Sequence, residues 1–141
     1  MIVAAEPPLI FLIEDNEADV HLVRASLDEH GVAHQLRVVK DGEQAARFID
    51  RIDTDQSVRQ RLPALIILDL NLPKRDGREV LKHLRASTRC AAIPVVIVTS
   101  SDSPADRDAT AALGASAYFR KPSQLEEFMC LGGLIKELID A

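Results

Sequence analysis

The sequence predicts a doubly wound α/β fold in which five strands and five helices alternate along the chain. Short apolar runs recur without alternation of polar and apolar positions, and helix-start residues follow each run. Runs of this kind are typical of strands buried on both faces of a parallel sheet. Parallel strands joined by right-handed crossovers then predict a three-layer sandwich with strand order 2-1-3-4-5.

The five predicted strands differ in hydrophobicity. Three are continuous apolar runs, and two are weaker candidates in which polar residues are mixed with apolar ones. The continuous runs are residues 9–13, 64–68 and 95–98, and the weaker candidates are residues 35–39 and 116–119. Residues 54–62 are polar and predict a loop before the third strand.

The five predicted helices begin at side chains that cap helix N-termini. Asn16 precedes the first helix, Ser103 is followed by a proline before the fourth, and Ser123 with Glu126 forms a capping-box pattern for the last. Gly31 supplies a stop for the first helix. The predicted ranges are residues 16–30, 41–53, 75–87, 103–114 and 123–139.

Length and composition restrict the class of protein. The 141 residues suffice for one domain, so we expect a single domain over residues 1–141 and no output domain. With 17 basic and 22 acidic residues the net charge is −5, which argues against direct nucleic-acid binding. Cys90 and Cys130 suit a reducing compartment. Without a signal peptide or an apolar run long enough for a bilayer, we expect a cytoplasmic protein that does not enter the membrane.

Polar residues follow four of the five predicted strands at the edge where ligands bind in such sheets. Carboxylates at Glu14, Asp15 and Asp69 would repel one another unless a proton or a cation neutralised them. Oxygen ligands with open positions suit Mg²⁺. Lys121 adds an ammonium group and Thr99 a hydroxyl, so the residues predict a site for a phosphoryl group carried on a carboxylate.

These residues and their order resemble the receiver domain of two-component response regulators over essentially the whole chain. The motifs are Glu14-Asp15, Asp69 with Asn71 and Pro73, Val98-Thr99-Ser100, and Lys121-Pro122, each at the end of a strand. The stretches 14–20 and 68–81 are similar to small stand-alone regulators paired with phytochrome-type histidine kinases. The resemblance therefore implies a flavodoxin-like receiver fold and a sensor histidine kinase, of the phytochrome type, as partner.

The resemblance also implies chemistry for the acidic residues. Asp69 would accept the phosphoryl group from a phosphohistidine of the kinase. Asp15, Asp69 and the backbone carbonyl of Asn71 would ligate Mg²⁺, with Mn²⁺ as a substitute, and Glu14 would lie in the outer shell. The protein would catalyse only its own phosphorylation and dephosphorylation, and would not act as an enzyme on an external metabolite.

Roles for the remaining strand-end residues follow from the same resemblance. Lys121 would pair with a phosphoryl oxygen, and Thr99 with the neighbouring Ser100 would register the modification. Tyr118 matches an aromatic position that turns inward in response, although a buried tyrosine without a switching role fits the residue as well. Pro122 would follow a cis peptide bond that aims the lysine.

Three other functions remain open on this fold. A flavin-binding electron carrier would need a hydroxyl- and glycine-rich phosphate loop where this chain has Glu14, Asp15 and Asn16. A Mg²⁺-dependent phosphatase with an aspartyl nucleophile would need more chain to hold its substrate. A degenerate receiver used only as a binding scaffold is the strongest alternative, and the intact acidic site argues against it.

The last predicted helix is apolar around more of its circumference than a one-sided helix needs. We expect part of that surface to form a homodimer contact, with Leu131, Leu134 and Leu138 as candidates. Packing of the terminal helix on its own sheet is the alternative. Gly132 and Gly133 lie inside this helix and favour a bend or an early end.

Overall fold

The computed structural model describes residues 6–55 and 61–140. Five parallel strands form one sheet in the order β2-β1-β3-β4-β5, which confirms the predicted topology. The strands are β1 (Leu9–Ile13), β2 (Gln35–Val39), β3 (Leu65–Leu68), β4 (Val95–Thr99) and β5 (Ala117–Arg120). Of the predicted loop over residues 54–62, residues 56–60 lie outside the described part of the chain.

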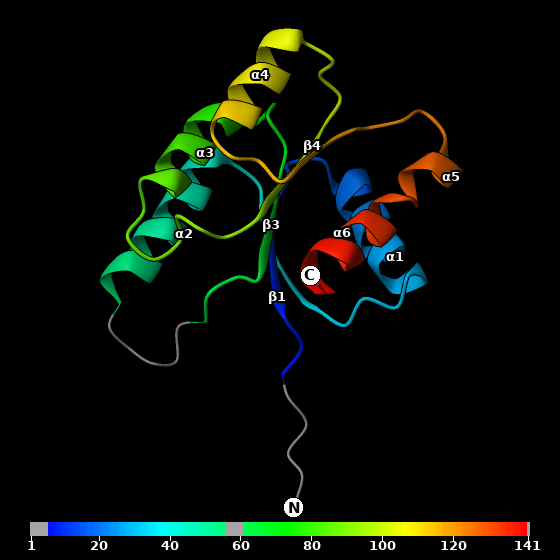
Figure 1. Ribbon diagram of the computed structural model, residues 1–141, viewed down its shortest axis with the longest axis horizontal. Coiled ribbons are helices and arrows are strands. Elements are labelled where there is room, and N and C mark those ends of the chain that lie inside the picture. The colour runs from blue at the N-terminus through cyan, green and yellow to red at the C-terminus, as the bar shows by residue number, and fades with distance from the viewer. Residues whose placement is uncertain (1–5, 56–60, 141) are drawn as a thin grey trace, which may run out of the picture.

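Helices cover both faces of this sheet (Figure 1). On one face lie α2 (Gly42–Thr54), α3 (Gly77–Arg85) and α4 (Pro104–Ala112). On the other lie α1 (Glu17–Glu29), the short α5 (Leu125–Phe128) and α6 (Leu131–Asp140). None of the helices within the described ranges is both long enough and apolar enough to cross a bilayer.

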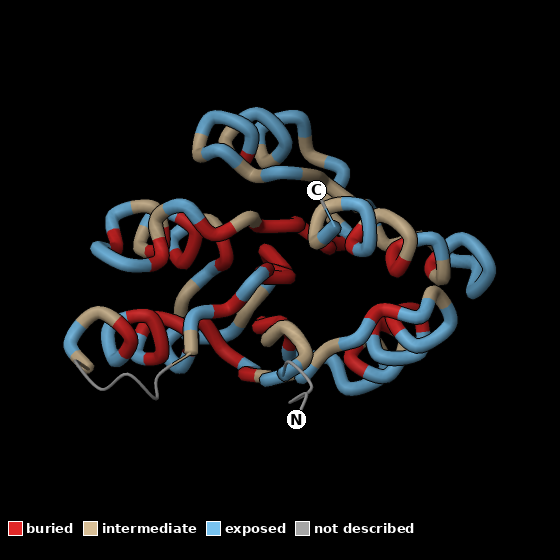
Figure 2. Tube along the Cα trace, turned by 60° about the horizontal axis from the view of Figure 1, so that its bottom comes forward, coloured by how far each residue is buried: buried red, intermediate tan, exposed pale blue. Residues whose placement is uncertain are grey.

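Burial explains why some strands were easier to predict than others. Every residue of β3 and β4 is buried, and so is all of β1 except Leu9, because these three strands are central in the sheet. Successive side chains serve opposite cores: Phe11 packs with the α2 and α3 side, and Ile10 with the α1 and α6 side. The more polar β2 and β5 are the two edges, and burial concentrates between the layers (Figure 2).

Four of the predicted helix starts are capped as the sequence indicates. The side chains of Asn16, Asp41, Asp76 and Ser103 each accept a backbone N–H from the first turn of their helix, at distances from 2.7 to 3.3 Å. Such caps satisfy donors that have no partner inside the helix. Gly31, just after α1, has a positive φ of 65°, which glycine adopts without steric cost.

The prediction of one continuous last helix with a Ser123 cap was wrong. Gln124 is the N-cap residue of α5 and makes no side-chain capping bond, and the chain interrupts the helix between Phe128 and Leu131. Contacts with α1 explain the break: the Met129 carbonyl accepts hydrogen bonds from Ser26 Oγ and His30 Nε2, both at 2.8 Å. A carbonyl held by another helix is withdrawn from its own helical ladder.

Gly132 allows α6 to approach α1 closely. Its N–H donates to Ser26 Oγ at 2.7 Å, and a Cβ at this position would lie 2.2 Å from the Ser26 carbonyl oxygen. At Gly133 a Cβ would first meet the His30 ring, 3.2 Å away, which is a movable side chain. The two glycines of this pair therefore differ in function: the first is required by packing and the second is not.

We expect Gly132→Ala to lower the free energy of unfolding by about 1–3 kcal/mol, because the added methyl group forces two helix backbones apart. Gly133→Ala is the matched control. There a small clash offsets a gain in helix propensity of about 1 kcal/mol, so the net change should be smaller. Urea unfolding of both variants measures the difference, and equal losses would contradict this account of the α1–α6 contact.

Candidate functional site

The carboxyl ends of β1, β3, β4 and β5 bring the predicted polar residues to one edge of the sheet. Sheet-like hydrogen bonds continue one residue beyond the strands. Glu14 N–H donates to the Val39 carbonyl, Asp69 N–H to the Ile13 carbonyl, and Lys121 N–H to the Thr99 carbonyl, at 3.0, 3.0 and 2.7 Å. The backbone of each site residue is therefore held by the strand beside it.

The Lys121 ammonium lies at the centre of the site. Its Nζ is 2.7 Å from Glu14 Oε1, 2.7 Å from Asp19 Oδ2 and 2.9 Å from Asp69 Oδ2. The Lys121 side chain is only 13% exposed, and those of Glu14 and Asp69 are 2% and 6% exposed. Buried ion pairs of this kind are shielded poorly by water, so each group strongly affects the ionisation of the others.

Burial and charge act in opposite directions on the pKa values of Glu14 and Lys121. Burial, with a contribution from Asp69, raises the pKa of Glu14 to about 8, and the opposing effect of Lys121 only limits the rise. Burial alone would lower the pKa of Lys121, but its carboxylate partners outweigh burial and raise that pKa. One ammonium therefore does not neutralise the carboxylates around it, and a further cation would be favoured here.

The geometry of the carboxylates fits a divalent metal ion. Glu14, Asp15 and Asp69 each offer a carboxylate oxygen, and these oxygens lie within 4.8 Å of one another. Asp15 is exposed, so the cluster opens to solvent, from which a hydrated ion could enter. Oxygen donors of this type suit Mg²⁺ or Mn²⁺. The residues present thus fit the predicted metal.

Asn71 connects the acidic cluster to the loop after β4. Its backbone N–H donates to Asp69 Oδ1 at 3.1 Å, while its side-chain Nδ2 lies 3.5 Å from Thr99 Oγ1. Thr99 is fully buried, and its hydroxyl oxygen also accepts the Ser101 N–H at 3.3 Å. Ser100, predicted to assist Thr99, is exposed. The metal ligation predicted for the Asn71 carbonyl stays a prediction.

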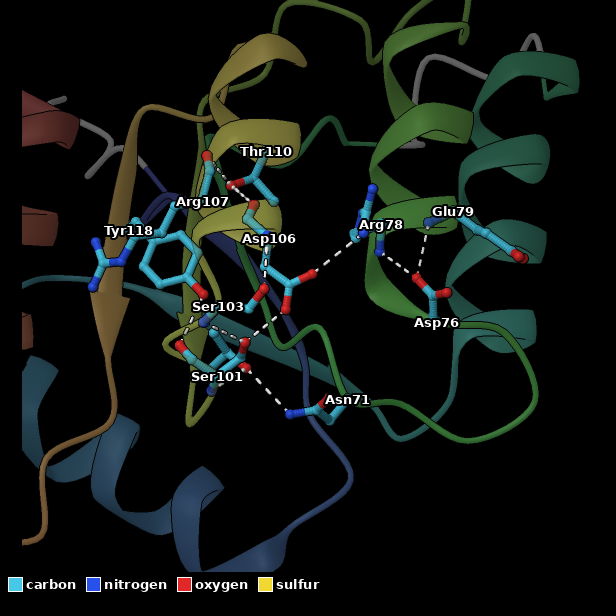
Figure 3. A network of polar contacts seen from close by, with 11 residues as sticks. Asn71, Asp76, Arg78, Glu79, Ser101, Ser103, Asp106, Arg107, Thr110 and Tyr118 are labelled. Atoms are coloured by element: carbon cyan, nitrogen blue, oxygen red, sulfur yellow. Dashed lines mark hydrogen bonds and ion pairs between the residues drawn. The ribbon is translucent and has the colours of Figure 1, made fainter.

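Beyond Thr99, a chain of polar contacts runs to β5 and α4 (Figure 3). Tyr118 donates its hydroxyl proton to the Ser101 carbonyl at 2.9 Å, and the Arg107 guanidinium lies over the Tyr118 ring, 4.3 Å from its centroid. Ser101 Oγ donates to Asp106 Oδ2 at 2.6 Å. Arg78 of α3 approaches the other oxygen of Asp106, at 3.4 Å. The loop after β4 is therefore tied to two helices and an edge strand.

Two site contacts were missed by reasoning from the sequence. Asp19 was not predicted as a site residue, yet it is one of the three carboxylates on Lys121. It lies three residues after the Asn16 cap, in the first turn of α1, and that turn faces the strand ends. Asp106 was not predicted as a site residue, since nothing in the sequence indicates its pairing with Arg78 on another helix.

The prediction of a cis peptide bond before Pro122 was wrong. No cis peptide bond occurs in the described residues, so the Lys121–Pro122 bond is trans. The trans form is intrinsically favoured by about 0.5–1 kcal/mol. The Lys121 ammonium reaches its three carboxylates from this backbone, held by the Lys121 N–H bond to Thr99, so contact with the site does not require the cis form.

The prediction that Leu131 contributes to a dimer contact was also wrong. Its side chain is completely buried within its own chain, in the same core as Val23 and Leu27 of α1. Leu134 and Leu138 are half-buried and pack against that core. Leu131 shares its buried face with Phe128 and Ile135, which lie three residues before it and four after it.

Comparison with known proteins agrees with this geometry. The model of the response regulator receiver domain family matches residues 10–130. Response regulator Rcp1 of Synechocystis sp. is 38% identical over 122 residues, covering 86% of this chain and 81% of Rcp1.

Two solved structures are also similar. The phosphorylated cyanobacterial phytochrome response regulator RcpA is 32% identical, with a TM-score of 0.84 and coverage of 96% of this chain and 95% of RcpA. The Mn²⁺-bound form of response regulator Rcp1 is 34% identical, with a TM-score of 0.81 and 93% coverage of both chains. The matched residues carry all four strand ends of the acidic site, and the chain thus belongs to the response regulator receiver domain family.

Proposed function

We propose that Asp69 accepts a phosphoryl group from a sensor histidine kinase in a Mg²⁺-dependent reaction. The observation that carries this proposal is the environment of the Asp69 carboxylate. One oxygen accepts the Asn71 N–H, the other contacts the Lys121 ammonium, and carboxylate oxygens of Glu14, Asp15 and Asp69 lie within 4.8 Å of one another. A fixed, nearly buried carboxylate next to cationic groups is suited to attack phosphorus.

In the proposed reaction, a carboxylate oxygen of Asp69 attacks the phosphorus of a phosphohistidine. The P–N bond breaks, the histidine keeps its electron pair, and an acyl phosphate remains on Asp69. A bound Mg²⁺ would supply positive charge against the phosphoryl oxygens. Lys121 would exchange part of its contact with Asp69 for a phosphoryl oxygen, and the Thr99 hydroxyl would donate to another.

The same residues would convert the modification into a change of surface. A phosphoryl group adds about −1.5 to −2 charge and strong acceptor oxygens. A Thr99 hydroxyl drawn toward it would leave the Ser101 N–H that it now accepts, and Ser101 holds both Tyr118 and Asp106. The surface formed by α4 and β5 would then rearrange and signal through protein contacts.

The kinase proposed for this chain is of the phytochrome type. RcpA is described as a cyanobacterial phytochrome response regulator, and its structure covers nearly all of this chain. The proposed setting is cytoplasmic, where a kinase would meet a small acidic receiver. The chain would turn over no external metabolite.

We also propose that the chain forms a homodimer through α6. Leu134 and Leu138 remain half-buried on this helix, and Leu125 of the neighbouring α5 is 59% exposed. Association would cover these side chains. Sedimentation at micromolar concentration, with and without phosphorylation, should show a dimer that Leu134→Glu/Leu138→Glu dissociates. Only monomer in both states would remove this proposal.

The phosphorylation proposal predicts a gain of one phosphoryl group when the protein is incubated with acetyl phosphate and Mg²⁺. Intact-mass measurement should show a hydroxylamine-labile product, because acyl phosphates react with that nucleophile. Asp69→Asn should abolish the gain, and so should removal of Mg²⁺. Asp28→Asn, which changes an exposed aspartate of α1, is the matched control and should leave the gain intact.

A stable product on Asp69→Asn would assign the acceptor to another residue. If neither acetyl phosphate nor a phosphorylated histidine kinase modified the wild-type chain, the scaffold interpretation would replace the switch.

The raised pKa of Glu14 predicts a pH dependence of stability. Without metal, a folded pKa of about 8 against an ordinary 4.5 means that the folded state favours the protonated carboxyl. This stabilisation is complete below about pH 4.5 and is lost as the pH rises through about 8. The metal-free protein should therefore lose unfolding free energy between about pH 4.5 and pH 8, more than Glu14→Gln does.

Mg²⁺ should reverse that trend, because the ion takes the place of the proton and binds more tightly as Glu14 ionises. Urea unfolding with EDTA or with Mg²⁺ measures both effects. Identical pH profiles for the wild type and Glu14→Gln would show that Glu14 does not titrate in this range.

A further inference from the structure

Three arginines gather at the β2 edge of the sheet, next to β1 in strand order. Arg37 of β2 and Arg47 and Arg51 of α2 line one groove of about 280 Å³ around the Phe48 ring. We call this set the arginine groove. The Arg37 guanidinium lies over Phe48, 4.8 Å from the ring centroid, so the aromatic ring holds it in place.

The arginine groove has a strong excess of positive charge. Among the described residues, neither this groove nor the adjoining one of about 680 Å³ along β2 is lined by a carboxylate, although the chain has 22 acidic residues and a net charge of −5. Within residues 6–55 and 61–140, Arg37, Arg47 and Arg51 form no ion pair. Unpaired arginines at one concave place favour an anionic partner.

The backbone of β2 offers hydrogen-bonding groups next to these arginines. Gln35 N–H donates to the Pro8 carbonyl, and the Val39 carbonyl accepts the Glu14 N–H, so both residues face β1. In a parallel strand, alternate residues face opposite neighbours. The N–H and C=O groups of Leu36 and Val38 therefore point away from β1, toward a side where no strand of residues 6–55 and 61–140 pairs with β2 and an added strand could.

The two faces of this edge differ in chemistry. Arg37 and Val39 lie on the α2 side, with the arginine groove. Leu36 and Val38 lie on the α1 side, where they pack against the second core. A strand added here would place alternate side chains on these two sides. Acidic residues would meet the arginines, and apolar or hydroxyl residues would extend the face that Leu36 and Val38 form.

We propose that the edge of β2 and the arginine groove form a docking site for an extended acidic segment of a partner protein, which adds to the sheet as a sixth strand. Its acidic side chains alternate, one at every second position. A second copy of this chain is a poor occupant, because pairing of two β2 edges would bring two arginine grooves together. Strand addition supplies affinity through the backbone, and alternate side chains supply specificity.

The probe is a fluorescent peptide two residues longer than β2 that alternates glutamate with valine or threonine, titrated with the full chain and followed by anisotropy. A second peptide has the same composition with its glutamates in one block. Two further peptides carry N-methyl groups on alternate amides, one for each set of alternate positions. Methylation removes backbone donors while it preserves charge, so it separates strand pairing from charge attraction.

We expect the alternating peptide to bind, the blocked peptide to bind at least about tenfold more weakly, and only one of the two N-methylated peptides to retain affinity. On the protein, Arg47→Glu/Arg51→Glu should weaken binding at least about tenfold. Lys82→Glu/Lys136→Glu makes the same change of charge at exposed sites on α3 and α6, and it should leave binding within about twofold.

The proposal would be overturned if the alternating and blocked peptides bound equally, or if both N-methylated peptides retained affinity. Either result would mean that the groove attracts acidic peptides only by non-specific charge. Absence of any binding by the alternating peptide would overturn it as well, and so would an equal effect of the two double variants. Circular dichroism of both double variants checks that each remains folded. None of these variants changes a residue of the acidic site, and the test uses the unphosphorylated chain, so it does not require Asp69 to be phosphorylated.

Discussion

The contact of one ammonium group with three carboxylates is the interaction on which the functional edge of this molecule depends. Lys121 holds Glu14, Asp19 and Asp69 together, although Glu14 follows β1, Asp19 lies on α1 and Asp69 follows β3. Without its charge, carboxylates buried this deeply would repel one another or take up protons. Burial still raises the pKa of Glu14 to about 8 despite the opposing effect of Lys121, so a cation at this place would be favoured. The same cluster thus attracts its three carboxylates to Lys121 and still favours a further cation.

The central strands could be predicted because burial on both faces leaves a strong sequence signal, and helix starts could be predicted because caps are local. The features that could not be predicted depend on contacts between residues far apart in the sequence. The break between α5 and α6 arises from hydrogen bonds that Ser26 and His30 make more than ninety residues away in the chain. Leu131 was misplaced because its burial depends on contacts with the core that contains Val23 and Leu27 of α1. Local sequence patterns therefore sufficed to predict the strands and most helix starts. The break between α5 and α6 depends on tertiary contacts, which these patterns do not contain.

The candidate site divides in the same way. Glu14, Asp15, Asp69, Thr99 and Lys121 were found because each directly follows a strand, and parallel strands end at a common edge. Asp19 and Asp106 lie on helices, where an acidic residue in the first turn has an ordinary explanation in the helix dipole. Only the structure shows that one contacts Lys121 and the other Arg78. The Lys121–Pro122 bond is trans, in contrast to the cis form that the family resemblance implies.

Strand order separates the two surfaces proposed for signalling. The contacts from Thr99 through Ser101 to Tyr118 lead to β5, at one edge of the sheet, and the arginine groove lies on β2, at the other. Partners at these edges would not compete for space. They would still share the acidic site, because the Val39 carbonyl at the end of β2 accepts the Glu14 N–H, and Glu14 contacts Lys121. If a strand bound to β2 altered this end of the sheet, it would change the equilibrium of phosphorylation at Asp69. Phosphorylation would then change the affinity of β2 for that strand by the same factor.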